Sequence, residues 1–410
     1  MNEYELLERL GQVEIGEAGN TFRAFLRGAA RDLILRVMSA EVEQLCGPAY
    51  RPDENSAHFR AGSAKGSVLH EGRSEPVKRP RVRKRTSDVE SEEVALSSYA
   101  AGREPGELHA MLLRALVGGV STRDQQEVHP ESPKASRSSV SRLFAQEGAR
   151  IFEEFRERDI ARDDWLALML DGVRLADELW AVVALSVAED GSKMMLDFEV
   201  GSSESAEVAT TLVSRLVERG FAPKAGCRLL CVFDGSKALR KATKTHWENA
   251  VFQRCLVHKE RNLRKYLSKR DWGELARFMA RIRKVQGARA GREALADLRR
   301  FVAKRNAEAL ASLEEAGEDL IALHLLEAPN TLHVSLLSTN LIENSIRNIR
   351  GKIGRVKRWR PETDQPRRWL AMALSEIEKG FRKLAGYRNL PALAAALVPD
   401  DKKEGASDAA

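Results

Sequence analysis

Three acidic side chains in this sequence can hold divalent metal ions together if the fold brings them to one point. They are Asp171, Asp234 and Glu343. Converging carboxylates repel one another unless cations neutralise them, and hard oxygen ligands of this kind select Mg²⁺ or Mn²⁺. Two such ions about 4 Å apart activate a water or a 3′-hydroxyl nucleophile and stabilise the leaving oxygen of an in-line phosphoryl displacement. The trio therefore indicates phosphodiester chemistry, without a covalent intermediate or ATP.

Each of these acids also has a simpler structural explanation. Asp171 and Gly172 follow an apolar run, and an Asp-Gly pair in that place is often a hairpin turn. Asp234 ends a similar run and can cap the short helix that follows it. Glu343 lies three residues after Asn340 and can complete a capping box at the start of a helix. The metal site therefore depends on the elements that position the three acids.

Short apolar runs bounded by turns predict five strands between residues 165 and 258. A helix over 205–219, ended by Gly220, separates the third strand from the fourth, and a short helix separates the fourth from the fifth. This order is that of an RNase H-like mixed sheet, in which the first and fourth strands are neighbours, so Asp171 and Asp234 should lie side by side. The predicted strands cover 165–170, 179–187, 194–200, 228–233 and 251–257.

The last helix of such a sheet domain is displaced along the chain. Residues 259–337 are charged and strongly helical, with predicted helices over 272–285 and 291–313. We interpret this segment as an all-helical insertion. The helix that completes the sheet domain is expected to begin at Thr339 and Asn340 and to carry Glu343.

A run of cations follows Glu343. Arg347 and Arg350 lie four and seven residues after it, on the same face of the predicted helix. The run contains no acid before Glu362, which favours salt-sensitive binding to phosphates that is largely independent of sequence, although a solvated basic face is the alternative. The candidate phosphate contacts are Arg347, Arg350, Lys352, Arg355, Lys357 and Arg358.

Two earlier segments can also contact DNA. Residues 78–85 hold six cations in eight positions, and their proline disfavours a helix, which indicates an extended basic arm or a solvated linker. Further on, a helix stopped by Gly118 and Gly119 precedes a longer helix with a polar start, which is typical of a helix-turn-helix but also of many helical pairs that never touch DNA. The candidate contacts are Lys78, Arg79, Arg81, Arg83, Arg137 and Arg142.

Composition limits the classes of protein to consider. The 410 residues suit two or three domains, and 67 Lys+Arg against 60 Asp+Glu favours polyanionic partners. The four cysteines form no paired framework, so we expect a reducing compartment. The N-terminus is acidic, and no apolar run approaches the roughly 20 residues that span a bilayer. We expect a cytoplasmic protein with no membrane function.

Four local segments resemble the Mutator-like superfamily of transposases encoded by bacterial insertion sequences. They are Met169–Val173, Val232–Gly235, Gln253–Asn262 and Ser338–Asn344. The resemblance implies that the two aspartates and the glutamate are the metal ligands of a DDE-type enzyme. It also implies a helical insertion before the glutamate, which accounts for a separation of 109 residues (343 − 234) against 63 (234 − 171) between the aspartates.

The third segment contains a Cys-x-x-His element, formed by Cys255 and His258. The resemblance implies that this element is adjacent to the active site, where it contacts DNA or supports the metal centre. A buried pair with a purely structural role is the alternative. A structural zinc site is not expected, because it takes four ligands and no second pair lies nearby.

The resemblance implies a DNA transposase that binds the terminal inverted repeats of its insertion sequence, cuts the strand with two Mg²⁺ or Mn²⁺ ions and transfers it to target DNA. A homodimer or larger synaptic assembly is expected, because two ends must be brought together. The alternatives are an RNase H-like nuclease that does not join strands and a transposase-derived regulator that binds DNA without cutting it.

The predicted fold class is α/β, with an RNase H-like core interrupted by the helical insertion and preceded by a mainly helical DNA-binding region. The predicted divisions are 1–90 with the basic arm, 91–160 with the helix-turn-helix, 161–258 for the first part of the core, 259–337 for the insertion, 338–385 for the last part of the core with the basic helix, and 386–410 for a C-terminal tail.

Overall fold

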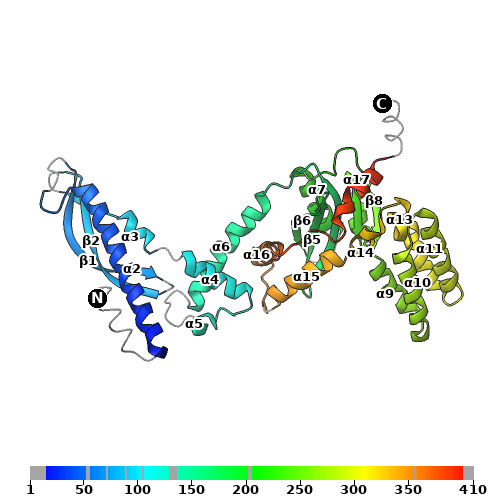
Figure 1. Ribbon diagram of the computed structural model, residues 1–410, viewed down its shortest axis with the longest axis horizontal. Helices are drawn as coiled ribbons and strands as arrows, with labels where there is room; N and C mark the ends of the chain where they lie inside the picture. Colours follow the sequence, from blue (N-terminus) through cyan, green and yellow to red (C-terminus); the bar gives the residue numbers. More distant parts are fainter. Residues whose placement is uncertain are drawn as a thin grey trace. The chain divides into compact units, whose positions relative to one another are not determined.

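The computed structural model is a mixed α/β structure with two sheets and many helices (Figure 1). Its contacts divide it into two compact units, with the boundary between Phe144 and Ala145. None of the described helices is both long and apolar enough to cross a membrane. The structure describes residues 15–51, 56–70, 73–87, 90–103, 106–128, 136–201, 206–354 and 356–399.

The first unit contains an antiparallel sheet within a region that was predicted to be mainly helical. Its strands, in the spatial order β1-β2-β3, are β1 (His58–His70), β2 (Arg73–Arg85) and β3 (Ser91–Val94). Helix α2 (Ile15–Cys46) packs Val42 against Val82 of β2 and against Leu96. The expected mainly helical region therefore also has a sheet at its centre.

The basic segment 78–85 lies within β2 and is not a free arm. A proline removes a ladder hydrogen bond and is normally confined to strand edges or bulges. Here β3 pairs only with residues 82–85, so Pro80 lies where β2 has no neighbour on that side. On the other side, Pro80 is opposite the irregularity between Arg60 and Ser63 of β1. The proline is therefore compatible with a strand.

A group of helices follows this sheet. Leu112 of α4 packs with Val140 and Leu143 of α6. Helix α4 ends just before Gly118 and Gly119, as the pattern predicts, and Gly119 has a φ of 108°, which favours glycine. The helices are α3 (Ser97–Ala101), α4 (Gly106–Val117), α5 (Gln125–Val128) and α6 (Arg137–Glu157).

The second unit contains the five predicted strands in the predicted order with the predicted intervening helices. The sheet order is β6-β5-β4-β7-β8, so the first and fourth of these strands are neighbours, as expected. The pairs β4–β5 and β5–β6 are antiparallel, whereas β4–β7 and β7–β8 are parallel. The strands are β4 (Trp165–Ala176), β5 (Leu179–Ala188), β6 (Lys193–Gly201), β7 (Leu230–Phe233) and β8 (Val251–Arg254).

Helices cover both faces of this sheet (Figure 1). On one face, α7 (Ala206–Glu218) and α8 (Lys237–His246) bury apolar side chains such as Leu212 against Leu168 of β4. On the other, α15 (Asn340–Ile353) and α16 (Gln365–Glu378) bury side chains such as Ile346 against Met169. The final sheet helix thus begins where the sequence predicts, and residues 165–170 are buried on both faces.

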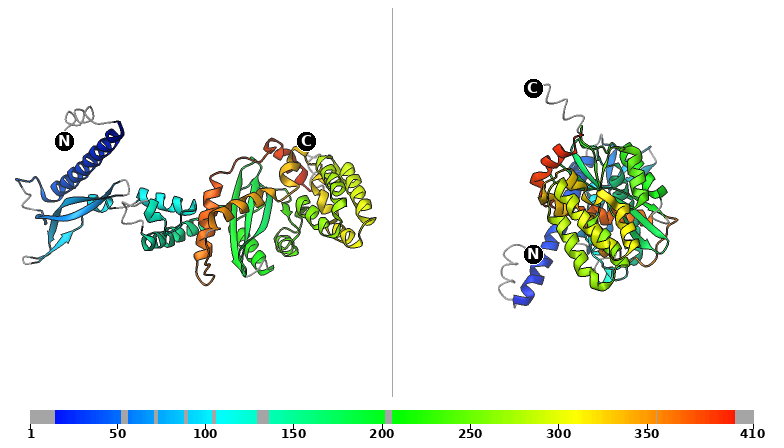
Figure 2. Two further views of the ribbon diagram at one scale, coloured as in Figure 1. Left: turned by 90° about the horizontal axis from the view of Figure 1, so that it is seen from below. Right: turned by 90° about the vertical axis from the view of Figure 1, so that its right-hand side faces the viewer.

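The segment between β8 and α15 is helical and gathers beside the β8 edge of the sheet (Figures 1 and 2). The single helix expected over 291–313 is wrong, because α11 ends at Ala303 and Asn306 caps a new helix by accepting a hydrogen bond from the Ala309 N–H at 2.8 Å. The main helices are α9 (Leu256–Tyr266), α10 (Trp272–Lys284), α11 (Ala288–Ala303), α12 (Ala307–Ala316), α13 (Ala322–Leu325) and α14 (His333–Leu336).

The expected tail over 386–410 is folded in its described part. Helix α17 (Leu390–Leu397) buries Leu393 in the core of the second unit. The Leu397 carbonyl accepts a hydrogen bond from the Arg228 N–H at 2.9 Å, just before β7. The buried apolar side chains of this short helix anchor the end of the described chain.

Candidate active site

The strand register places Asp171 and Asp234 at the same level of two neighbouring strands. Strands β4 and β7 run parallel and pair Met169 with Val232, an offset of 63 residues (232 − 169). The two aspartates have the same separation, 63 residues (234 − 171). They therefore occupy equivalent positions at the point where β7 ends.

The pleat of the sheet directs both aspartates to the face that α15 covers. Successive side chains of a strand alternate between the two faces. Met169 and Val173 belong to the apolar core on the α15 side, and Asp171 lies midway between them in β4. Asp234 follows Val232, whose side chain belongs to the same core, by two residues. Both carboxylates are thus presented to the element that carries the third acid.

The hairpin-turn interpretation of Asp171 is wrong. Strand β4 continues through Asp171 and Gly172 as far as Ala176, and the turn to β5 falls at Asp177 and Glu178. The expectation that the strand ends at residue 170 is wrong for the same reason, because pairing with β5 outlasts pairing with β7. The Asp171 Oδ1 accepts a hydrogen bond from the Gly172 N–H at 2.8 Å.

Asp234 is not the cap of the helix that follows. The N-cap of α8 is Ser236, whose Oγ accepts a hydrogen bond from the Leu239 N–H at 3.4 Å. The Asp234 Oδ1 instead accepts a hydrogen bond from the Ser236 N–H at 2.9 Å. Between them, Gly235 has a φ of 119°, a backbone conformation that favours glycine. This turn leaves the half-buried Asp234 carboxylate at the end of β7.

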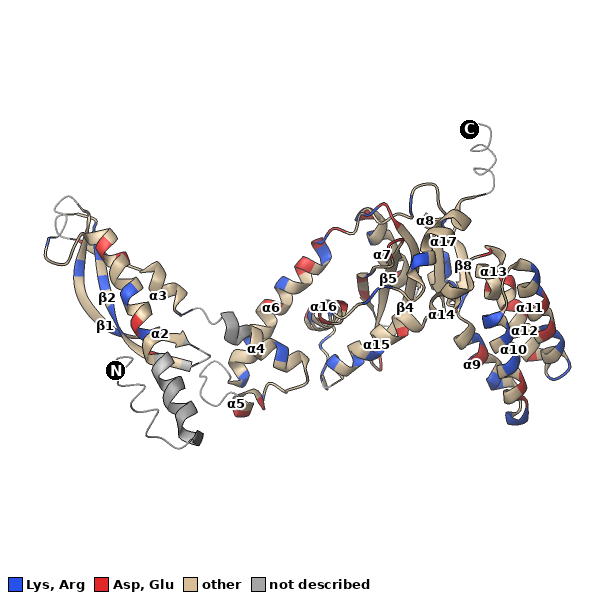
Figure 3. Cartoon of the chain, viewed as in Figure 1, with Lys and Arg blue, Asp and Glu red and all other residues tan. Residues whose placement is uncertain are grey.

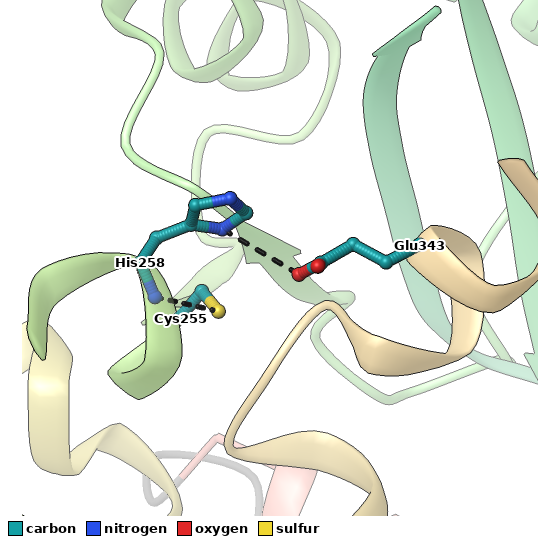
Figure 4. Close-up of side chains that lie close together, drawn as sticks. All are labelled: Cys255, His258 and Glu343. Carbon is teal, nitrogen blue, oxygen red and sulfur yellow. Dashed lines mark hydrogen bonds and ion pairs between the residues drawn. The ribbon is translucent and has the colours of Figure 1, made fainter. Parts of the chain in front are cut away.

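Glu343 is held in the first turn of α15 by side chains from two elements. Its Oε1 accepts a hydrogen bond from the Thr339 hydroxyl at 2.7 Å and lies 3.7 Å from the His258 Nδ1. Its Oε2 lies 3.6 Å from the Arg261 guanidinium of α9. Figure 4 shows the carboxylate of Glu343 directed towards the imidazole of His258.

A capping box does not account for Glu343. That motif needs the glutamate carboxylate to accept the N–H of the N-cap residue. The N-cap of α15 is Thr339, and its N–H donates instead to the Cys255 Sγ at 3.3 Å. The carboxylate of Glu343 therefore contacts the Thr339 hydroxyl and the α9 side chains. The Thr339 N–H is bound by the Cys255 sulfur instead.

Cys255 and His258 lie next to this carboxylate. The predicted strand over 251–257 ends at Arg254, because Cys255 is the N-cap of α9 and its Sγ accepts the His258 N–H at 3.5 Å (Figure 4). The register of β7 and β8 pairs Phe233 with Arg254, so Cys255 follows at the level of Asp234. Within the described ranges, the ligand atoms of Cys255, His258 and Glu343 all lie within 4.8 Å of one another.

Hydrogen bonding shifts the pKa values of this pair in opposite directions. Burial raises the pKa of the Cys255 thiol, but hydrogen bonds with His258 and Thr339 outweigh burial and hold it below its ordinary value. The hydrogen bond with Cys255 raises the pKa of His258 against the effect of burial, and the negative charges of Glu343 and Asp234 add to the rise. Two of the three predicted ligands thus act on the same imidazole from different elements.

The donor atoms decide which residues suit a metal ion. The Cys255 sulfur is fully buried, already accepts from the His258 N–H and the Thr339 N–H, and lies 3.2 Å from the Thr339 hydroxyl oxygen. A sulfur so occupied fits an anchor better than a zinc ligand. The carboxylates of Asp171, Asp234 and Glu343 are half-buried hard oxygen donors, which fit Mg²⁺ or Mn²⁺.

Sequence reasoning did not assign roles to Thr339 and Arg261. Thr339 lies four residues before Glu343, one helical turn away, and Arg261 lies three residues after His258 on α9. Those spacings place side chains on one helical face and are the available sequence signal. They do not indicate which of many such pairs touch a functional acid. The contacts between α9 and α15 in the structure identify this pair.

The predicted phosphate contacts after Glu343 lie on α15 and the segment that follows it. Figure 3 shows the cations of α15. Arg347 and Arg350 are exposed on the helix, Lys352 is half-buried, and Lys357 and Arg358 are exposed beyond its end. Arg355 lies outside the described residues. Four predicted cations therefore remain accessible to solvent close to Glu343 in the sequence.

Most of the predicted cations of β2 have partners within their own sheet. Arg79 and Arg81 share the carboxylate of Glu93 on β3, at 3.0 and 2.7 Å, and Arg83 donates to the Ser91 carbonyl at 2.7 Å. Hydrogen bonds from Arg81 and Arg79 lower the pKa of Glu93 to about 2.

The other predicted cations of the first unit are exposed. Lys78 lies on β2, and Arg137 and Arg142 lie in the first turns of α6. The Arg142 Nε donates to the Ser138 carbonyl at 3.4 Å, a contact within its own helix. These three side chains keep their charged ends available to a partner.

Comparisons with known proteins agree on one family. A sequence profile described as "Transposase, Mutator family" matches residues 1–383. The chain is 26% identical over 363 residues to a transposase for insertion sequence element IS905 of Lactococcus lactis, covering 84% of this chain and 86% of that protein. It is 29% identical over 254 residues to a transposase for IS256 in transposon Tn4001 of Staphylococcus aureus, covering 59% and 63%. A transposase for IS6120 of Mycolicibacterium smegmatis is 27% identical over 223 residues, covering 52% and 66%.

Proposed function

This chain belongs to the Mutator family of transposases, and from that premise we propose that it cuts and joins the DNA ends of its own insertion sequence with Asp171, Asp234 and Glu343. The observation that carries the proposal is the strand register. It aligns the two aspartates on the sheet face covered by the helix that holds Glu343. Three acids from distant parts of the sequence then serve one site.

We further propose that the sheet is an RNase H-like core interrupted by an all-helical insertion. The order β6-β5-β4-β7-β8 and the return of the chain through α15 support this interpretation. The core then comprises residues 161–258 and 338–385, the insertion 259–337, and the DNA-binding region residues 1–90 and 91–160.

Asp171, Asp234 and Glu343 would hold two Mg²⁺ or Mn²⁺ ions. When bound, such ions stabilise the attacking and leaving oxygens of a phosphoryl displacement. The chain itself orients the glutamate, since the Thr339 hydroxyl and His258 hold Oε1 and Arg261 approaches Oε2.

Cys255 acts on Glu343 indirectly, through Thr339. Its sulfur accepts the Thr339 N–H at 3.3 Å and lies 3.2 Å from the Thr339 hydroxyl oxygen, and it thereby fixes the residue that orients Glu343. Thr339, His258, Arg261 and Cys255 are therefore positioning residues in this proposal. Side chains so held keep a ligand in one geometry, which matters for metal affinity.

The substrate in this proposal is duplex DNA with the terminal inverted repeats, followed by target DNA. The cations after Glu343 would contact phosphates beside the cut bond, namely the exposed Arg347, Arg350, Lys357 and Arg358 and the half-buried Lys352. Such contacts give affinity without sequence preference, so the repeats would be recognised by the first unit, with Lys78, Arg137 and Arg142 as its exposed candidates. Two ends would be joined by a homodimer or a larger assembly.

The test uses the purified full chain and a labelled duplex with the inverted repeat found beside the gene. With Mg²⁺ or Mn²⁺, we expect a nick that exposes a 3′-hydroxyl at the repeat, followed by joining of that strand to a plasmid. Cutting without joining would identify a nuclease. Binding of the repeat without any nick would identify a regulator, and either result would overturn the proposal.

A further inference from the structure

Helix α8 begins three residues after Asp234 and presents a row of cations. Lys237, Lys241 and Lys244 are exposed and recur at spacings of four and three, so they lie on one helical face. None of the three forms an ion pair with any residue in the described ranges. A row of uncompensated ammonium groups at this spacing fits successive phosphates of a polyanion.

These cations line a groove on the surface of α8. The groove has a volume of about 500 Å³, and its charged lining consists of Lys237, Arg240, Lys241, Lys244 and the single acid Glu248. Because Arg240 pairs with Asp319, the lining leaves three lysines against one acid, which makes it a site for anions. Its lining residues extend along the helix from Lys237 to Glu248, which suits a chain of phosphates better than an isolated anion.

A pocket of about 310 Å³ opens at the N-terminal end of the same helix and shares Lys237 and Arg240 with the groove. Its apolar walls are Phe233 and Phe252, and the Arg240 guanidinium lies over the Phe252 ring at 4.4 Å from the ring centroid. A cavity of roughly 150 Å³ holds a benzene ring, so this pocket has room for one nucleobase. Arginine planes and aromatic rings are the surfaces on which unpaired bases stack.

Charge distinguishes the pocket from the groove. The pocket also contains Glu315 and Asp319, which pair with Arg254 and Arg240 respectively. These acids disfavour a phosphate inside the pocket, but their oxygens can accept hydrogen bonds from a base edge. The backbone of a bound strand is therefore favoured in the groove, and a base is favoured in the pocket.

The pocket wall also touches the residue that follows Asp234. A Cβ on Gly235 would lie 2.2 Å from the Arg254 guanidinium, so that guanidinium packs directly on the Gly235 backbone. Arg254 is fixed there by two hydrogen bonds to Glu315, at 2.9 and 3.0 Å. Gly235 therefore belongs both to the pocket wall and to the turn that follows Asp234, whose carboxylate faces the α15 side of the sheet.

We propose that the α8 groove and its pocket bind an unpaired DNA strand beside the cleavage site, with phosphates on Lys237, Lys241 and Lys244 and one unstacked base in the pocket. This rests on the function proposed above and adds a specific strand path to it. A base in a duplex is stacked and paired, and it can reach such a pocket only after leaving the stack.

The first test measures binding of a fluorescein-labelled duplex with a ten-nucleotide unpaired tail and of the same duplex without a tail, in the absence of divalent ions. The full chain should prefer the tailed duplex, and K237Q/K241Q/K244Q should lose that preference. For the tailed duplex, loss of three phosphate contacts should reduce the salt slope of log K by about 2. The matched control K265Q/K269Q/K304Q removes the same charge from exposed sites on the helical segment and should behave as wild type.

The second test moves a single abasic site along the tail. One position should weaken binding by about tenfold, as expected for loss of one stacked base. Equal affinity at every position, an α8 variant that keeps the tail preference, or a control that loses it would overturn the inference. Because the assay needs no cleavage and can be repeated with Asp171→Asn, its failure is distinguishable from failure of the proposed reaction.

Discussion

Two groups of acids in the same sheet differ in how their charge is neutralised. On β6, Asp197 is fully buried and has Arg215 and Arg219 at 2.7 and 3.1 Å, with Arg156 at 3.5 Å. At the ends of the parallel strands, the charged partners of Glu343 within the described part of the chain are a histidine at 3.7 Å and an arginine at 3.6 Å. No residue of the described ranges forms an ion pair with Asp234. The arginines of the protein itself neutralise the first group, whereas the second group can accept cations from outside the protein.

The largest expected effect comes from substitutions in the second group of acids, which leave the first group intact. Asp171→Asn, Asp234→Asn and Glu343→Gln should each reduce DNA cleavage to background, because an amide is a poor ligand for a hard divalent ion. The folded structure and the binding of DNA ends should be unchanged. Asp177→Asn, in the exposed turn after β4, is the matched control and should cleave normally. Appreciable cleavage by any of the three variants would refute their role as ligands.

The next effect breaks the first group and concerns stability. Asp197→Asn leaves three arginines around a neutral amide, and removing one partner of a buried ion pair typically costs about 3–5 kcal/mol. The midpoint of urea unfolding of the second unit should fall accordingly. In contrast, Asp234→Asn should leave that midpoint nearly unchanged. If the two variants lost similar stability, the distinction between the groups would be wrong.

A smaller effect sharpens the account of how Glu343 is oriented. Thr339→Val keeps the shape of the side chain but removes the hydroxyl that donates to Glu343 at 2.7 Å. Loss of a group that orients a ligand typically costs about 10- to 100-fold in metal affinity or activity. Cleavage should therefore require more Mn²⁺ for half-maximal rate, and Thr339→Ser should restore it. A uniform fall at all Mn²⁺ concentrations would instead indicate a general structural defect.

The smallest expected effect is a pH dependence of stability that arises from Glu199, which lies on β6 with Asp197. Burial raises the pKa of Glu199, but its hydrogen bond with Arg215 and the charges of Arg215 and Arg156 outweigh burial and lower it. A carboxyl with a lowered pKa in the folded state contributes stability above its unfolded pKa, near 4.5, and loses it as the pH falls through the folded value. The free energy of unfolding should therefore fall below about pH 4.5, and less steeply in Glu199→Gln. Equal slopes would contradict this assignment.

The sequence patterns were most informative where burial dominates. The runs around Leu168 and Val232 are buried on both faces, so their apolar pattern predicted the strands, and the strand order predicted the adjacency of β4 and β7. The end of β4 was predicted wrongly, because Gly172 and the residues after it pair with β5 beyond the apolar run. An apolar run indicates which residues are buried, and it does not indicate how far a hairpin extends.

Other features depend on contacts that no local pattern contains. In the first unit, Val82 of a strongly basic strand packs with Val42 of α2. Thr339 reaches Cys255 from 84 residues away along the chain. The capping alternatives for Asp234 and Glu343 used the correct local chemistry, but Ser236 caps α8 and the Thr339 N–H at the start of α15 donates to Cys255. Spacing located the acids, and only the fold shows what surrounds each one.

The central claim is that three acids from separate segments share one metal site. Fe²⁺ bound in place of Mg²⁺ reduces added hydrogen peroxide to hydroxide and a hydroxyl radical. The radical cuts the polypeptide near the ion, and the fragments can be mapped by mass spectrometry. We predict cuts around residues 171, 234 and 343 together, suppressed by excess Mg²⁺ and lost from all three segments in Asp171→Asn. Cutting that leaves any one of these segments intact in the wild-type protein would contradict the account.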